Sequence, residues 1–237
     1  MTANASPLPR FTPALAQPPL TWQRLVVWSL AALALPLAWD ASGLDVPLAH
    51  LFGSAQGFAL THDWWLQTVL HHGAQRVGWA LVAALALTIV WPVGPLRALP
   101  RADRAGLVAG IVLAALAVQV LKRLSTTSCP WDLQAFGGTA AYVSHWRWGV
   151  RDGGGGHCFP AGHASTAFSF VAAWFWLRPW APRLARMWLV LALLLGLALG
   201  VVQMARGAHY LSHVLWSGWV CWVVGGAWWL GMRKRFS

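Results

Sequence analysis

The sequence predicts an all-α polytopic membrane protein, a six-transmembrane-helix bundle with an interfacial amphipathic helix. Apolar residues make up 58% of its 237 residues and charged residues only 10%, against about 45–50% and roughly 25% in soluble domains. The 19 Trp residues also fit a bilayer, because tryptophan favours the membrane–water interface. Six apolar segments each approach the length of about 20 residues that a membrane helix requires.

The predicted spans follow one another along a single domain, residues 24–231. Their ranges are 24–40, 76–93, 104–121, 162–178, 186–206 and 212–231. Before them, the proline-rich residues 1–23 predict a flexible cytoplasmic tail, and after them residues 232–237 form a basic cytoplasmic tail. Segment 58–75 is too polar to span, so we expect it to lie along the outer interface as an amphipathic helix.

The distribution of basic residues predicts the orientation. They concentrate in both tails and in the loops between spans two and three and between spans four and five, which the positive-inside rule assigns to the cytoplasm. The other loops, about 41–75, 122–161 and 207–211, then face outward. We therefore expect a multi-pass protein of a bacterial inner membrane, and assign the net charge of +11 to contacts with lipid headgroups rather than nucleic acid.

Three polar clusters fall at outward ends of the spans: residues 121–132, 157–165 and 205–216. Each has a simple structural interpretation, because Lys122 and Arg123 could end a helix by snorkelling and Ser165 could begin one. A lone His163 could also be structural. Ionisable groups inside membrane spans usually mark function, however, and three clusters on one face are what an interfacial active site requires.

The clusters resemble the three motifs of the phosphatidic acid phosphatase type 2 superfamily, in the same order. The first motif is Lys-x6-Arg-Pro, and here Lys122 is followed after six residues by Cys129-Pro130. The second is Pro-Ser-Gly-His, which resembles Pro160-Ala161-Gly162-His163. The third is Ser-Arg-x5-His-x3-Asp, whose histidine falls on His209. The resemblance covers about residues 24–231.

The resemblance implies a metal-independent phosphatase that needs no cofactor and acts on a lipid phosphate or diphosphate in the membrane. Implied substrates include undecaprenyl diphosphate, lipid A phosphates and phosphatidic acid. His209 would attack phosphorus to give a phosphohistidine, and His163 would protonate the leaving oxygen. The phosphate would be held by cations and by donors at the start of the fourth span: Lys122, Arg123, Arg206, Gly162 and Ser165.

Several motif positions depart from the family pattern. Cys129 stands where the family has a phosphate-binding Arg, and Val202 and Gln203 stand where it has Ser-Arg. We expect the nearby Arg123 and Arg206 to supply the missing charge. The third departure is His213, which replaces the Asp that orients the nucleophile. Either His213 itself or Asp132 could provide the acceptor.

The cysteines suggest a further link between motifs. Cys129 and Cys158 both fall in the outer loop, where an oxidising periplasm would permit a disulfide. Such a bond would close a loop of about thirty residues and contribute about 3 kcal/mol, tying the first motif to the second. Two unrelated thiols are the alternative.

Three other functions stay open at this stage. The same histidine could transfer the phosphoryl group to an acceptor other than water. The i, i+4 spacing of His209 and His213, with His163 as a third ligand, could instead mark a zinc site. Because motif residues are missing, the chain could also be a non-catalytic lipid-binding or transport protein of the same fold.

Overall fold

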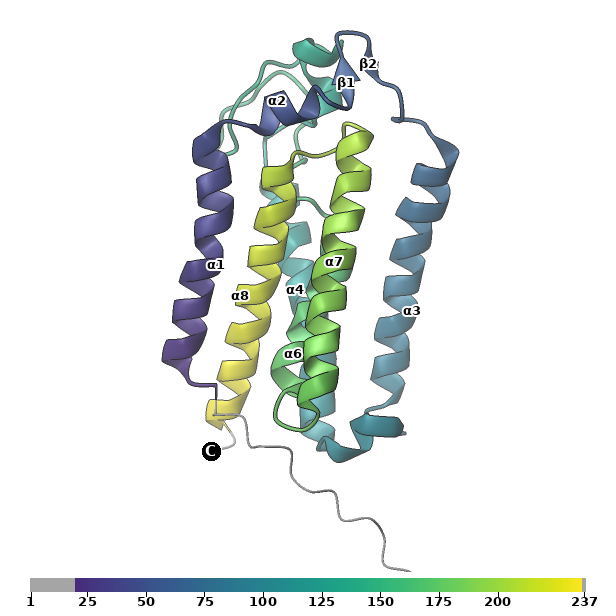
Figure 1. The fold of residues 1–237 in the computed structure, drawn as a ribbon, viewed down its shortest axis with the longest axis vertical. Helices are drawn as coiled ribbons and strands as arrows, with labels where there is room; N and C mark the ends of the chain where they lie inside the picture. The colour runs from purple at the N-terminus through teal and green to yellow at the C-terminus, as the bar shows by residue number, and fades with distance from the viewer. Residues whose placement is uncertain (1–19, 236–237) are drawn as a thin grey trace, which may run out of the picture.

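A computed structural model describes residues 20–235, which form a bundle of roughly parallel and antiparallel helices (Figure 1). The expected tail 1–23 therefore lies almost entirely outside the described residues. The longest helices are α1 (Trp22–Ser42), α4 (Arg101–Leu124), α7 (Pro182–Ala205) and α8 (Leu211–Arg235). Among the described residues, these four helices are long and apolar enough to cross a membrane. The chain is a multi-pass membrane protein.

Two predicted spans take a different form. The fourth, expected over 162–178, is a shorter apolar helix over Ser165–Leu177. Its segments are α5 (Ser165–Phe168), the 3-10 turn η5 (Ser169–Val171) and α6 (Ala172–Leu177). The second, expected over 76–93, is α3 (Ala74–Leu87), which is preceded without a break by the π-helix η1 (Trp65–Gly73).

Segment 58–75, expected to lie along the interface, does not form a separate amphipathic helix. It begins in the hairpin of β1 (Gly53–Ser54) and β2 (Gly57–Phe58), turns, and then runs through η1 into α3. Three polar residues of the segment, Gln67, His71 and Gln75, line a cavity. A helix that covers a polar cavity has the same alternation of polar and apolar faces as one that lies on a membrane.

Short elements cover the end of the bundle opposite the two chain ends of the described residues (Figure 1). They are α2 (Asp45–Ala49), the β1–β2 hairpin, and the 3-10 turns η3 (Pro130–Asp132) and η4 (Gln134–Phe136) (Figure 1). The Asp45 carboxylate accepts hydrogen bonds from the backbone N–H and the hydroxyl of Ser212. Because these groups lie in the first turn of α8, Asp45 satisfies donors that the helix itself leaves free.

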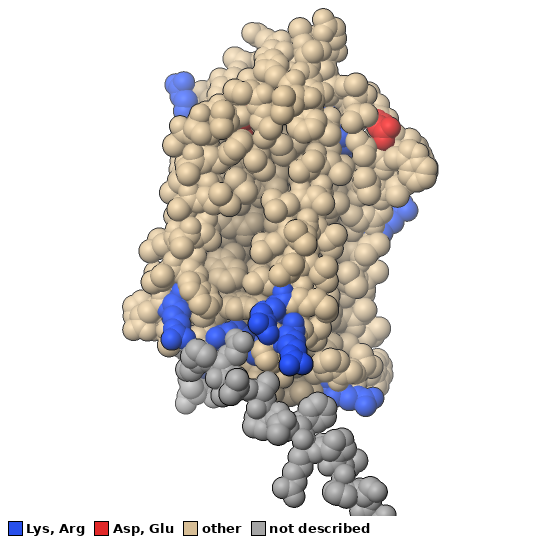
Figure 2. Space-filling view, in the orientation of Figure 1, with Lys and Arg blue, Asp and Glu red and all other residues tan. Residues whose placement is uncertain are grey.

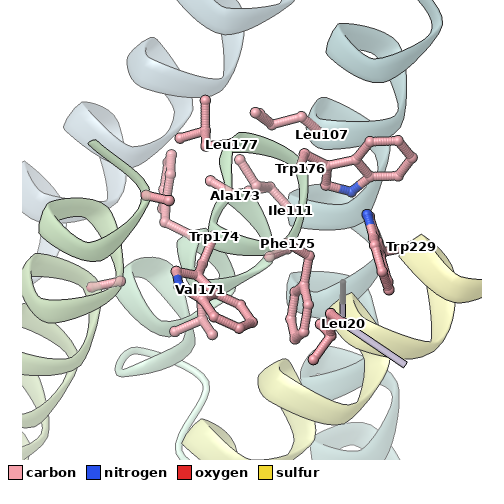
Figure 3. Packing of buried hydrophobic residues seen from close by; sticks show 14 of the residues in the cluster. Leu20, Leu107, Ile111, Val171, Ala173, Trp174, Phe175, Trp176, Leu177 and Trp229 are labelled. Carbon is pink, nitrogen blue, oxygen red and sulfur yellow. The ribbon is translucent and has the colours of Figure 1, made fainter. Parts of the chain in front are cut away.

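The apolar core lies toward the other end and is dominated by α6. Trp176 and Phe175 are 1% exposed and pack with Leu107, Ile111 and Trp229 from α4 and α8 (Figure 3). The indole of Trp176 lies against Gly106, where a Cβ atom would collide with it. Close approach of α4 and α6 therefore needs glycine at this position.

Basic residues gather at this same end, away from the hairpin (Figure 2). Arg97 lies in the 3-10 turn η2 (Gly94–Ala98), and Arg101 begins α4. Arg104 is buried and donates to three backbone carbonyls. At this end Asp103 accepts a hydrogen bond from Trp180 Nε1 at 2.9 Å and pairs with Arg233 at 3.4 Å.

Candidate active site

A cavity of about 330 Å³ lies beneath the loops at the hairpin end of the bundle. It is formed by η1 and the start of α3, the end of α4, the loop before α5, and the turn between α7 and α8. All three polar clusters of the sequence therefore contribute to one space. Its lining includes both motif histidines, His163 and His209, the two cysteines, four glutamines, Lys122 and Arg206.

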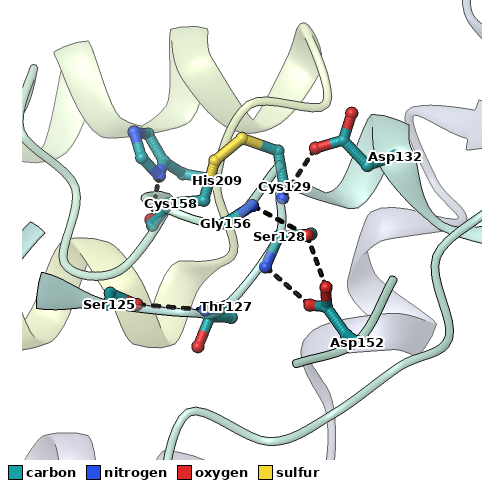
Figure 4. Close-up of a disulfide and its surroundings, with 9 residues drawn as sticks. All are labelled: Ser125, Thr127, Ser128, Cys129, Asp132, Asp152, Gly156, Cys158 and His209. Carbon is teal, nitrogen blue, oxygen red and sulfur yellow. Dashed lines mark hydrogen bonds between the residues drawn. A yellow bond between two sulfur atoms is a disulfide. The ribbon is translucent and has the colours of Figure 1, made fainter. Parts of the chain in front are cut away.

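His209 is buried and its Nδ1 lies 2.8 Å from the carbonyl oxygen of Cys158 (Figure 4). A carbonyl oxygen can only accept, so Nδ1 carries the proton and Nε2 keeps its lone pair. Burial lowers the pKa of His209 well below its usual range, and the nearby charges of Lys122 and His213 lower it further. The imidazole is therefore neutral at physiological pH, the form in which it is a nucleophile.

The Cys158 carbonyl is fixed by several bonds. Cys158 forms a disulfide with Cys129, and their Cα atoms are 5.2 Å apart. The Cys158 N–H donates to the Thr127 carbonyl at 2.9 Å. Asp152 completes the arrangement by accepting from the N–H and hydroxyl of Ser128 at 2.7 and 2.6 Å. First and second motifs are thus joined around the atom that orients His209.

Neither residue expected to orient His209 does so. His213 is buried beside it, with ring centroids 5.7 Å apart, but forms no hydrogen bond to it. Asp132 lies on the far side of the disulfide (Figure 4), where its carboxylate accepts the Cys129 N–H at 3.1 Å. Asp132 caps the η3 turn, and the acceptor for His209 comes from the backbone instead.

His163 lies in the loop before α5 and is 7% exposed. Its pKa is lowered to about 4, mainly by burial and also by the neighbouring His71, Arg206 and Lys122, while a hydrogen bond to the Leu70 backbone acts in the opposite direction. His163 Nε2 is buried without a hydrogen-bond partner among the described residues. A buried, unsatisfied nitrogen in a polar cavity is suited to a ligand that supplies charge and an acceptor.

Two cations reach the cavity. Lys122 lines it from α4. Arg206 lines it from the end of α7, where its guanidinium donates to the Thr61 carbonyl at 3.0 and 3.2 Å and to Gln203 Oε1 at 3.3 Å. Gln203 keeps a buried Nε2 without a partner among the described residues. Together Gln203 and Arg206 place N–H donors where the family motif has a single arginine.

Two other expected phosphate ligands lie elsewhere. Arg123 is exposed and does not line the cavity, because it follows Lys122 by one residue and so points from a different face of α4. The Ser165 hydroxyl donates to the Gly162 carbonyl at 2.6 Å, within the first turn of its own helix. Gly162 does line the cavity, and a Cβ there would lie 3.0 Å from Gln119 Nε2 and 3.1 Å from Lys122 Cδ.

Several lining residues fall outside the motifs. His71 and His72 come from η1, and the ring of His71 stacks on that of His163. The i, i+4, i+8 spacing of Gln67, His71 and Gln75 was the available signal, since it places three polar groups on one helical face. Among the described residues, no three His, Cys, Asp or Glu side chains are grouped as a metal site.

Comparison with known proteins agrees with the motif assignment. The sequence model of the PAP2 superfamily matches residues 104–237, more than half of the chain. The chain belongs to the PAP2 superfamily. PAP2 proteins are phosphatases, so this membrane protein has the fold of a phosphatase family, and the matched residues contain all three motif regions.

A solved PAP2 structure has a similar fold. It is the crystal structure of the first transmembrane PAP2 type phosphatidylglycerolphosphate phosphatase from Bacillus subtilis. The similarity has a TM-score of 0.51 at 17% sequence identity and covers 90% of this chain and 96% of that chain. No curated protein matches this chain.

Proposed function

We propose that the protein hydrolyses a lipid phosphate or diphosphate through a phosphohistidine at His209. One observation carries the proposal: the same cavity contains a neutral histidine with a free Nε2, a second buried histidine and two cations. A phosphoryl transition state spreads negative charge over its oxygens, so catalysis requires mainly positioning and positive charge. The cavity provides both.

In the first step His209 Nε2 attacks phosphorus, and a P–N bond forms as the bond to the leaving oxygen breaks. His163 gives its proton to that oxygen. The phosphorylated imidazole is positively charged, and its Nδ1–H then makes a charge-assisted hydrogen bond to the Cys158 carbonyl. In the second step neutral His163 takes a proton from water, and the resulting hydroxide attacks phosphorus to release phosphate and free His209.

Lys122, Arg206 and Gln203 hold the phosphate in this scheme. The first two supply charge, and the Gln203 amide supplies an N–H donor. Gly162 allows the substrate and the Lys122 side chain to share a narrow space, since a methyl group there would meet Lys122. No step in this sequence requires a metal or a cofactor.

We further propose that the cavity faces the periplasm of a bacterial inner membrane. The arginines of η2 and of the start of α4 lie at the opposite end of the bundle, which the positive-inside rule assigns to the cytoplasm. Both the hairpin and the disulfide then belong to the oxidising side.

The test is phosphate release by the purified protein from detergent-solubilised lipid phosphates and diphosphates. His209→Gln should abolish release, whereas the exposed His62→Gln should leave it unchanged. Release without dependence on His209 would refute the proposal. If the substrate is consumed and its phosphate appears on an added alcohol instead of as free phosphate, the protein is a phosphotransferase.

A further inference from the structure

A third histidine of the cavity, the half-buried His71, has a role that the motifs do not explain. His71 comes from η1, and its ring stacks on His163 with centroids 4.1 Å apart and planes 11° from parallel. Its Nδ1 is buried without a hydrogen-bond partner among the described residues. It also lies in a π-helix, a rare conformation that often occurs at functional sites.

The stack restricts the rotation of the His163 ring, in addition to the hydrogen bond between His163 and the Leu70 backbone. Two flat rings in parallel contact fix each other's plane, so His71 limits how far the His163 ring can turn in the cavity. Parallel rings also cannot hydrogen-bond to each other in their plane. The ring nitrogens of His71 and His163 are therefore available for hydrogen bonds to the backbone or to a ligand in the cavity.

The stack also affects where positive charge can reside. The groups that face the two rings come from different elements: His72 on η1, Lys122 on α4, Arg206 at the end of α7, and His209 before α8. In the empty cavity the fixed cations disfavour a further positive charge on either ring. A bound phosphate offsets the positive charge of those cations. One of the two stacked histidines can then be protonated, and the electron density of the neutral partner ring stabilises its charge.

We propose that His71 is a positioning residue for the reaction, which holds the His163 ring for proton transfer and couples its protonation to phosphate binding. This inference rests on the proposed function, because it assumes that His163 protonates the leaving oxygen. His71 itself does not touch the reacting atoms in this scheme.

The test compares His71→Phe, which keeps a stacking ring but cannot titrate, with His71→Ala, which removes the ring. The exposed His62→Phe is the matched control. In His71→Phe we expect kcat to fall less than about tenfold, while the basic limb of the kcat/KM profile moves to higher pH by about one unit. In His71→Ala we expect kcat to fall by about a hundredfold, because His163 is no longer held.

Nitrogen-15 histidine NMR of the ligand-free protein gives a second readout that does not depend on turnover. His163 should titrate at higher pH in His71→Phe than in the wild type. If the His163 titration and the pH profiles of His71→Phe both match those of the wild type, the inference is overturned. It is also overturned if kcat falls equally in His71→Phe and His71→Ala while neither pH profile changes. If His163→Ala and His209→Ala keep full phosphate release, the proposed function fails instead, and the NMR titration still reports on the coupling.

Discussion

The Nδ1 atom of His209 lies 2.8 Å from the carbonyl oxygen of Cys158, and Cys158 is joined covalently to Cys129. Two departures from the family motifs are thus connected. Cys129 occupies the position of a motif arginine, and its disulfide partner supplies the acceptor that the missing aspartate would have supplied. A backbone carbonyl is uncharged, so its contribution lies mainly in fixing the tautomer and direction of the imidazole.

Removal of the disulfide tests this connection. In Cys129→Ser/Cys158→Ser, or after reduction of the wild type, the Cys158 peptide is less constrained. We expect kcat to fall about tenfold to a hundredfold with little change in KM, and the stability to fall by about 3 kcal/mol. Assays below the measured unfolding temperature separate the two effects. Cys221→Ser, which removes the buried thiol of α8, should respond to reductant as the wild type does. A fully active reduced protein would show that the bond is dispensable.

Arg206 should carry much of the phosphate binding. Arg206→Gln removes a guanidinium that lines the cavity, and we expect kcat/KM to fall about a hundredfold or more, as for loss of a transition-state donor. Arg123→Gln is the matched control, because Arg123 is exposed outside the cavity, and it should stay within about twofold of the wild type on the same grounds as other surface changes. An equal fall of kcat/KM in Arg206→Gln and Arg123→Gln would indicate that Arg123 also binds the phosphate.

Gly162 should tolerate no side chain. In Gly162→Ala the added methyl group would lie 3.1 Å from Lys122 Cδ, so Lys122 must move away from the phosphate. We expect KM to rise and kcat/KM to fall about tenfold or more. Gly155→Ala is the comparison, since a Cβ at Gly155 meets nothing within 4 Å. Steady-state kinetics of the two alanine variants provide the test. Equal kcat/KM values in both would contradict the role assigned to Gly162.

The pH profiles should separate the free enzyme from its substrate complex. His163 has a pKa of about 4 in the empty cavity and must be protonated to act, so kcat/KM should fall as the pH rises above that value. The acid limb, set by His209, lies lower still because burial depresses its pKa.

The basic limb of kcat should lie at higher pH than that of kcat/KM, because bound phosphate offsets the charges of Lys122 and Arg206. Ionisation of the substrate could also produce a basic limb. In His163→Asn the limb that comes from His163 should be absent, whereas a limb that comes from the substrate would remain. Coincident limbs for kcat and kcat/KM in the wild type would contradict this assignment of charges.

Hydropathy predicted the long helices of the bundle, because apolar length is a property of the sequence itself. The long helix of residues 101–124, for example, was expected over 104–121. The 58–75 segment was misassigned, because a polar helical face can cover either a cavity or a membrane surface. Its residues Gln67 and His71 belong to the cavity.

The motifs predicted His163, His209 and Lys122 as site residues, and the three line one cavity in the structure. The acceptor for His209 could not be found in this way, because any residue has a backbone carbonyl and only the folded loop selects the one at Cys158. The same holds for Thr61, whose carbonyl binds Arg206 from 145 residues away. Arg123 and Ser165 do not line the cavity, because proximity in sequence does not specify which face of a helix a side chain occupies.

The most direct test of the mechanism is to trap the phosphorylated enzyme. Protein mixed with a lipid phosphate labelled at phosphorus and quenched within one turnover should carry label that is stable to base and labile to acid, as a phosphohistidine is. The label should be absent in His209→Gln and present in His62→Gln. Labelled His209→Gln, or a wild type that releases phosphate in the burst phase without any labelled protein, would contradict the account.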